Sequence, residues 1–433
     1  MLEFSLILII GLLAGIIVGL LPGIPAYLGP ILLYPFVHNL SIAEILTFWL
    51  ACQIGSQYFG SVAAILLKIP GEASSLVYIN DIEHISMQDR YALVRQTAWG
   101  STVGSIVSLI LLMGIYYLGL GTELVQLTNT SIKLLVLIIL VSTLIYFSNR
   151  KLLSLILFLV GVFLSEKTNQ NFPNWVFNIQ DYTSDITIFS LILGLLIIPE
   201  FLKEINIKKI QQKLEIKIND ILPIEWRNII NGTWIGALVG LVPGPSSVLS
   251  TMLAYNYKPN DKLTKRIISA ESANNSATIT SLLPFLYIGL PITLSEMLLV
   301  DIFQVKLFNI PTDMHYAVGP INLIEFCFVI IAVYSLAYHF LAQRFLDSYK
   351  RLMELAHGKL MWLYLLIITY IIYVDIHFIP VNLFRYFIFA ILLTIIGCWM
   401  LKKNVNVLPL IFGYLLGDMI LWTGYHFYMI NFY

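Results

Sequence analysis

A thirteen-residue apolar stretch that occurs twice constrains the fold of this chain more than any other feature. Residues 11–23 read GLLAGIIVGLLPG, and residues 232–244 read GTWIGALVGLVPG. Seven of the thirteen positions are identical without a gap, so one constant shift in numbering, here called the repeat offset, carries Gly11 onto Gly232 and Gly23 onto Gly244. The repeat offset also aligns Gln53 with Asn274, two residues with the same amide chemistry. The chain is therefore predicted to consist of two halves built on one plan.

Glycine recurs at every fourth position of the repeated stretch, at Gly11, Gly15 and Gly19 in the first copy. This spacing puts the glycines on one helix face, where a second backbone can approach closely, as it does in membrane helices. The terminal Pro-Gly stops such a helix, because proline lacks an N–H group and glycine tolerates a positive φ. One copy alone would indicate an ordinary kinked membrane helix, whereas paired interrupted segments are typical of transporter binding sites.

The composition places these helices in a membrane. Of the 433 residues, 58% are hydrophobic and 12% are charged, and the apolar runs are long enough to cross a bilayer. The 25 basic and 25 acidic residues leave no net charge, so nothing indicates a nucleic-acid partner. The cysteines lie in apolar runs and the histidines lack ligand spacing, so neither disulfides nor a metal site are expected. The first apolar run lacks the basic region of a signal peptide and is expected to be part of the fold.

The apolar runs predict an all-α polytopic membrane protein with about 10 to 12 membrane segments. The predicted segments are a re-entrant hairpin over 4–37, spans over 43–69, 92–119, 132–148, 152–165 and 186–202, a second hairpin over 229–257, and spans over 266–288, 315–341, 360–378, 384–401 and 406–424. The predicted parts are transport repeat 1 (1–125), connecting spans with a cytoplasmic linker (126–228), transport repeat 2 (229–346) and C-terminal spans (347–433).

Lysine and arginine gather in five loops, and the positive-inside rule assigns such loops to the cytoplasm. The loops contain Arg150 and Lys151, the lysines of 203–217, the basic residues of 258–266, those of 344–359, and Lys402 with Lys403. All five can face the cytoplasm in this map if the second half begins inside and the first half begins outside. The sequence therefore predicts inverted-topology repeats, the arrangement that alternating-access transporters use.

Hydroxyl residues follow the predicted breaks, at Ser74 and Ser75 in the first half and at Ser246 and Ser247 in the second. Hydroxyls and free N–H groups at the N-terminus of a half-helix bind carboxylate oxygens. The predicted substrate-binding residues are Gly23, Pro25, Gln53, Ser74, Ser75, Gly244, Ser246, Ser247, Asn274 and Asn275. The predicted helix breaks are Pro22, Pro70, Gly71, Pro243, Gly289 and Pro291.

Asn274 and Asn275 lie inside a predicted span, where polar groups are costly. Side-chain amides also join membrane helices to one another, so a purely structural hydrogen-bonding role is the alternative. The matching position of Gln53 favours a functional role. Glu271, in the same span, has a second interpretation as a superficial residue paired with Lys265 or Arg266.

These motifs resemble those of the large membrane subunit of the tripartite tricarboxylate transporters, the TctA-like family. The resemblance covers most of the chain in the same order, and it rests on Gly11 to Pro25, Gln53 to Gly60 with Ile69-Pro70-Gly71, Gly232 to Ser247, Glu271 to Ala277, and Leu283 to Pro291. It implies a multi-pass protein of the inner membrane that is not an enzyme and has no cofactor. It also implies a small carboxylate as substrate, an extracytoplasmic solute-binding protein, a small membrane subunit, and symport with Na⁺ or H⁺ as the coupling ion.

Two alternative functions come from other classes. A passive anion channel is expected to have a ring or line of pore charges, whereas the polar residues here gather at two breaks. An intramembrane aspartyl protease would need two facing aspartates, and Asp375 and Asp418 fall near opposite faces of the predicted topology. The family resemblance therefore gives the favoured interpretation, and it implies cation-coupled uptake of a di- or tricarboxylate by alternating access.

Overall fold

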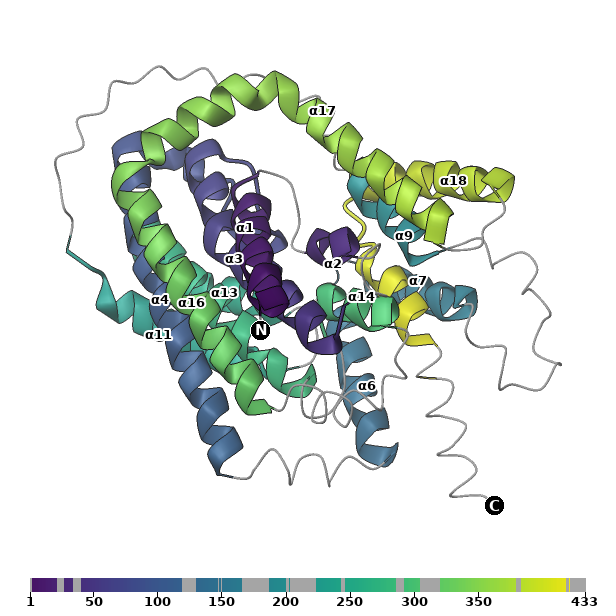
Figure 1. The fold of residues 1–433 in the computed structure, drawn as a ribbon, viewed down its shortest axis with the longest axis horizontal. Helices are drawn as coiled ribbons and strands as arrows, with labels where there is room; N and C mark the ends of the chain where they lie inside the picture. The colour runs from purple at the N-terminus through teal and green to yellow at the C-terminus, as the bar shows by residue number, and fades with distance from the viewer. Residues whose placement is uncertain are drawn as a thin grey trace. The chain divides into compact units, whose positions relative to one another are not determined.

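Every regular element in the part of the chain that the structure describes is a helix (Figure 1). The structure is a computed structural model, and it describes residues 2–21, 27–33, 40–118, 130–146, 148, 150–165, 187–199, 202, 223–242, 246–285, 292–303, 320–378, 383–417 and 420. The predicted all-α class is confirmed for these residues. The chain divides into one unit of Met1–Gln126 with Lys209–Leu355 and a second unit of Leu127–Lys208 with Ala356–Tyr433.

The first unit holds the helices of both predicted repeats. In the first half these are α1 (Leu2–Leu20), α2 (Leu28–Leu33), α3 (Ile42–Leu67), the short helices η2 (Ala73–Val77) and η3 (Asp81–His84), and α4 (Met87–Tyr117). In the second half they are α11 (Trp226–Val239), α12 (Ser246–Asn256), α13 (Leu263–Thr280), α14 (Leu294–Phe303), α16 (Pro320–Arg344) and the start of α17 (Leu346–Phe378).

Helices lie on both sides of each repeated Pro-Gly. The first half has α1 before Pro22-Gly23 and α2 after it, and the second half has α11 before Pro243-Gly244 and α12 after it. Among the predicted break and site residues, Pro22, Gly23, Pro25, Pro243, Gly244, Gly289 and Pro291 lie outside the described residues, as do Asp418 and the lysines of 203–217.

The glycine stripes let α1 and α11 approach their neighbours at backbone distance. A Cβ atom on Gly19 of α1 would collide with Phe59 of α3, and one on Gly240 of α11 would collide with Thr280 of α13. The repeat offset that carries Gly19 onto Gly240 also carries Phe59 onto Thr280. The two halves therefore share a packing register as well as a sequence motif.

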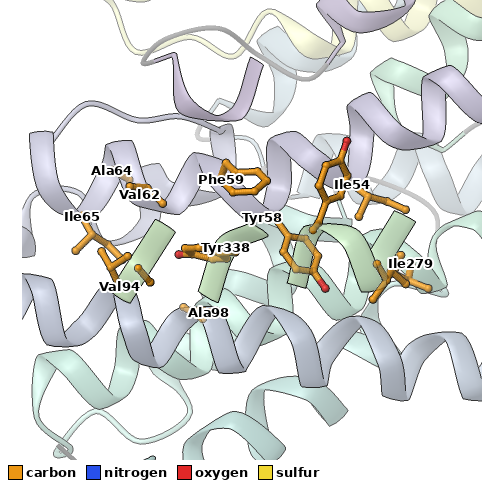
Figure 2. Packing of buried hydrophobic residues seen from close by; sticks show 14 of the residues in the cluster. Ile54, Tyr58, Phe59, Val62, Ala64, Ile65, Val94, Ala98, Ile279 and Tyr338 are labelled. Atoms are coloured by element: carbon orange, nitrogen blue, oxygen red, sulfur yellow. The ribbon is translucent and has the colours of Figure 1, made fainter. Parts of the chain in front are cut away.

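A buried apolar cluster holds α3, α4, α13 and α16 together in the first unit (Figure 2). Figure 2 shows Tyr338 of α16 between the helices α3 and α4. Its hydroxyl group bonds to Ser61 of α3 at 2.7 Å and to Thr97 of α4 at 3.0 Å. These bonds satisfy a phenol that would otherwise be buried without a partner, and they position α16 against both helices.

The second unit contains the connecting and C-terminal helices. They are α6 (Thr130–Tyr146), α7 (Lys151–Leu164), α9 (Ile188–Ile192) continuing into the π-helical turn η5 (Leu193–Ile197), most of α17, α18 (Leu383–Lys402) and a final described helix, Leu408–Gly417. Inside this unit the Thr187 hydroxyl donates to the buried Asp375 carboxylate at 2.6 Å. Asp375 therefore has a structural partner within its own unit.

Among the described residues, four helices are long and apolar enough to cross a membrane, namely Ala43–Leu67, Met87–Ile115, Glu325–Arg344 and Leu383–Lys402. Shorter apolar helices include Leu6–Leu20, Lys151–Leu164 and Trp362–His377. The predicted span 360–378 is the C-terminal part of the longer helix α17. The hydropathy pattern did not predict the first turns of α17, because Asp347, Lys350 and Arg351 make them polar. These turns are helical all the same, and lysine and arginine have high helix propensity.

Candidate functional site

The break at Pro70-Gly71 begins where α3 ends. Ser41 and Glu44 form a reciprocal capping box at the start of α3, and Lys68 terminates it in a left-handed conformation with φ 59°. Pro70 follows, and it cannot continue a helix. The chain then turns back along α3 at Gly71, where an added Cβ atom would lie 2.5 Å from the carbonyl oxygen of Gly60. This close approach brings η2 beside the middle of α3.

Glu72, the residue after Gly71, reaches two side chains of α3. Ser56 donates its hydroxyl to Glu72 Oε1 at 2.6 Å, and the amide nitrogen of Gln57 donates to Glu72 Oε2. Gln57 is buried, whereas Glu72 keeps part of its surface exposed. The carboxyl group is thus held by two neutral donors.

Glu271 of α13 lies in the interior of the first unit, with 1% of its surface exposed. The Tyr78 hydroxyl donates to Glu271 Oε1 at 2.5 Å, and Tyr78 directly follows η2, the short helix that begins after Glu72. The interpretation of Glu271 as a superficial ion pair is wrong, because burial against the first half takes its carboxyl out of reach of the helix end. Lys265 pairs with Glu225 at 3.0 Å, and Arg266 donates to the Tyr255 carbonyl at 2.9 Å.

Asn274 and Asn275 are both buried but bond differently. The Asn275 nitrogen donates to Ser101 of α4 at 3.0 Å and to the carbonyl of Glu271 at 3.1 Å. Its carbonyl oxygen has no hydrogen-bond partner among the described residues, and the same is true of Asn274 Oδ1. Asn275 therefore joins α13 to α4, in agreement with the structural alternative, while both residues present an unused oxygen.

Gln53 of α3 likewise has an amide oxygen without a partner among the described residues. Residues that the sequence did not single out, Ser56 and Gln57, complete the polar face of α3. Gln57 lies four residues after Gln53, and this spacing inside an apolar span is a signal that could have identified it.

The serines that follow the two breaks lie on neighbouring elements, because α12 packs against η2. Ser74 is buried with a hydroxyl that has no described partner, whereas Ser75 donates to the Glu72 carbonyl at 2.7 Å. Ser246 is the buried first residue of α12, and Ser247 is half-buried. The structure therefore brings the segment after Pro70-Gly71 against α12, the helix that follows Pro243-Gly244.

Glu296 is a further buried carboxyl group that the sequence analysis missed. It accepts hydrogen bonds from the backbone N–H groups of Ile292 at 2.7 Å and Thr293 at 3.0 Å, at the start of α14. The signal was present, because Thr293 and Glu296 have the spacing of a capping box. The repeat offset aligns Glu296 with Ser75, so α14 corresponds in sequence to η2. The Glu296 carboxylate caps the N-terminus of α14, just after the predicted break at Gly289 and Pro291.

Metal-ligand geometry is absent from the described part of the chain, where no three His, Cys, Asp or Glu residues gather. The polar groups on the facing sides of η2, α3, α12 and α13 are carboxyl, amide and hydroxyl groups. Such groups can bind a small polar solute and a light cation, both of which carry hydration that these atoms can replace.

The model of the family described as the tripartite tricarboxylate transporter TctA family matches residues 6–412 of this chain. The chain is also similar to a protein from Agrobacterium vitis described as an uncharacterized 52.8 kDa protein in the TAR-I ttuC' 3' region. The two are 28% identical over 314 residues, a match that spans 65% of this chain and 60% of that protein's length. No solved structure matches the chain.

Proposed function

Because the chain belongs to the tripartite tricarboxylate transporter TctA family, we propose that it carries a small di- or tricarboxylate across the cell membrane by cation-coupled alternating access. Members of this family are transporter subunits and not enzymes. The apolar helices agree with a membrane protein. The inner membrane is the proposed location, and a small membrane subunit and an extracytoplasmic solute-binding protein are the proposed partners.

The observation that carries this proposal is the meeting of the two halves at their breaks. The segment after Pro70-Gly71 packs against α12, the helix after Pro243-Gly244. In addition, Tyr78 of the first half donates to Glu271 of the second half. A site shared by two repeats can open to either side of the membrane when one repeat rocks against the other. Polar groups concentrated at such a junction are the expected position for a substrate.

An inverted relation between the repeats is part of the proposal, and helix directions support it. Contacts between α4 and α13 rise together in residue number, from Gly100 against Ser272 to Ser108 against Ser276. Contacts between α3 and α16 also rise together, since Ala51 bonds to Tyr334 and Ser61 to Tyr338. By contrast, α4 and α16 run in opposite directions, with Arg95 bonding to Ala342 and Thr97 to Tyr338. Thus α3 and its repeat equivalent α13 run antiparallel.

The carboxylate is proposed to bind at the N-terminus of α12, where the helix dipole is positive. Ser246 and Ser247 would supply hydroxyl donors, and Gly244 with Gly23 would form the tips that a carboxylate approaches. Ser74 on the adjacent η2 adds a hydroxyl group without a described partner. Donors are needed here, because a carboxylate has only acceptor oxygens.

Uptake by the reconstituted transporter, together with its small subunit and binding protein, tests the proposal. Vesicles would be given labelled di- and tricarboxylates under an imposed Na⁺ or proton gradient. We expect accumulation above the external concentration, abolished by an ionophore that collapses the gradient. A passive anion channel would equilibrate the solute without accumulating it, and no carboxylate movement under either gradient would refute the proposed function.

A further inference from the structure

Two carboxyl groups from different repeats are connected through the short helix η2. Glu72 precedes the first residue of η2, and Tyr78, which follows its last residue, donates to Glu271 of α13. The ion pairs recorded among the described residues involve neither of them, since Lys68 pairs with Glu83 and Lys265 with Glu225. The pair is therefore an uncompensated negative site inside the first unit.

The donors around this pair are all neutral. Ser56 and Gln57 bond to Glu72, and Tyr78 bonds to Glu271. Neutral donors cannot cancel two negative charges in a region of low dielectric, and two ionised carboxylates side by side are strongly unfavourable. A bound positive charge is consequently required whenever both groups are ionised.

Charged groups on the surrounding helices are engaged elsewhere. Arg90 of α4 donates to the Ile82 carbonyl at 2.6 Å, and Arg95 of α4 donates to the Ala342 carbonyl at 3.2 Å. Arg227 of α11 is exposed. Among the tyrosines, Tyr255 of α12 donates to Asp81. Tyr78 donates to Glu271, and the hydroxyl of Tyr338 of α16 is bonded to Ser61 of α3 and Thr97 of α4. Both tyrosines are neutral hydrogen-bonding groups at ordinary pH.

Oxygen atoms without a hydrogen-bond partner among the described residues occur on Glu271 itself and on two residues bonded to the acids, Gln57 and Asn275. Glu271 Oε2, Gln57 Oε1 and Asn275 Oδ1 are buried and have no hydrogen-bond partner among the described residues. The orientation of the Asn275 amide follows from its bonds, because only its nitrogen can donate to the carbonyl of Glu271. Buried acceptors without donors are costly, and an oxygen-rich site suits a hard cation rather than an anion.

We propose that Glu72 and Glu271 together hold one monovalent cation, Na⁺ or a proton, and that this is the coupling ion of the transport cycle. The inference rests on the proposed function for its coupling role, but the cation site itself stands on the geometry of the first unit. Tyr78 is a positioning residue that orients the Glu271 carboxyl.

The origin of the two acids suggests how the ion is coupled to movement. One acid belongs to each repeat, so a rocking motion between the repeats changes the distance between them. The affinity for the cation then differs between the two states, and a ligand shifts a conformational equilibrium only through such a difference.

Thermal unfolding of the purified full-length protein, without substrate or partners, tests the site. One series raises Na⁺ at fixed pH and constant ionic strength with choline as replacement ion, and another lowers the pH without Na⁺. We expect wild-type Tm to rise by about 5 °C in one series, since a ligand at a hundredfold excess over its Kd stabilises the state that binds it. A response to Na⁺ identifies sodium as the ion, and a response to pH alone identifies the proton.

Glu72→Gln and Glu271→Gln should each remove this response, whereas Glu83→Gln should retain it. Glu83 is the matched control, because it is an exposed acid in the same connecting segment and pairs with Lys68. Tyr78→Phe serves if Glu271→Gln does not fold, and it should shift the midpoint of the cation titration by about threefold or more, the equivalent of a weakened hydrogen bond.

A wild-type Tm that responds to neither Na⁺ nor pH would overturn the proposal, as would a full response in both glutamine variants or an unchanged midpoint in Tyr78→Phe. Different results would refute the cation site and the proposed transport function. Cation-coupled carboxylate uptake that persists in Glu271→Gln would refute the site alone, whereas specific cation binding without any carboxylate uptake would refute the function alone.

Discussion

Asn274 and Asn275 are adjacent in α13, yet their amide groups have different surroundings. The side-chain nitrogen of Asn275 donates to Ser101 of α4, whereas the side-chain oxygen Oδ1 of Asn274 has no partner among the described residues. A buried polar group without a partner costs free energy and persists where something else requires it. Asn275 therefore joins two helices, and we expect the Asn274 side chain to contribute to substrate binding.

Asn274→Ala is expected to reduce carboxylate uptake at least tenfold with little change in Tm, because no described hydrogen bond is lost. Asn275→Ala should lower both, with a loss of stability of about 1 kcal/mol for the bond between α13 and α4. Uptake by the reconstituted transporter and thermal unfolding check the pair. Wild-type uptake by Asn274→Ala with reduced Tm would favour the purely structural alternative.

Ser246 and Ser247 are predicted to donate hydrogen bonds to the carboxylate at the start of α12. The double replacement by alanine should raise the half-saturating substrate concentration by about tenfold, which corresponds to one charge-assisted hydrogen bond. Ser250→Ala is the control on the same helix, since the Ser250 hydroxyl already donates to the carbonyls of Ser247 and Ala273. An unchanged half-saturating concentration in the double variant would place the carboxylate elsewhere.

At the scale of elements, the glycine stripes determine how each half packs. Gly232 of α11 lies against the backbone of Ser269 in α13, and the repeat equivalent of this contact is Gly11 of α1 against the backbone of Phe48 in α3. Membrane helices associate through close packing rather than through hydrophobic burial, so small residues at these contacts have a large effect. The same register in both halves gives two similar packed layers.

Gly236→Ala should destabilise the protein by about 1 to 3 kcal/mol, because the methyl group would collide with a carbonyl oxygen that cannot move away. Gly114→Ala in α4 is the matched control, since a Cβ atom there meets no atom within 4 Å. Alanine is the better helix former, so Gly114→Ala should be neutral or slightly stabilising. Equal Tm values for the two variants would show that the stripe does not determine packing.

At the scale of the whole molecule, the first unit joins two segments that are distant in sequence, and the junction is made by side chains from both. Tyr78 and Glu271 are separated by 193 residues, and Trp49 reaches Ser295 across 246 residues with a hydrogen bond of 2.8 Å. These contacts link helices of the first half to those of the second. The second unit consists of the connecting and C-terminal helices, which form their own contacts.

Cysteine labelling tests the inverted topology that this arrangement supports. Cysteines introduced at Leu2 and Pro223, which the repeat offset makes equivalent, should react with an impermeant reagent from opposite sides of the membrane. Cys52, Cys327 and Cys398 would first be replaced, so that only the introduced thiols report. Labelling of both positions from the same side would contradict inverted repeats.

Local features of the sequence determined the helices and the ends of several of them. A proline or a capping residue acts within one turn of its own helix, so Pro70 and Ser41 could be read without knowledge of the fold. Glycine spacing likewise predicted the flat faces of α1 and α11, because a helix places every fourth residue on one side. The repeat offset predicted that both halves would use those faces in the same way.

Only the tertiary structure decided which distant side chains meet. The sequence left Glu271 between a buried and a superficial role, and packing decided the question by bringing Tyr78 beside it. Packing also directs the side-chain nitrogen of Asn275 to Ser101, and its Oδ1 has no partner among the described residues. No residue type or spacing encodes a contact across 193 residues, because such a contact depends on the relative positions of helices that pack through their whole surfaces.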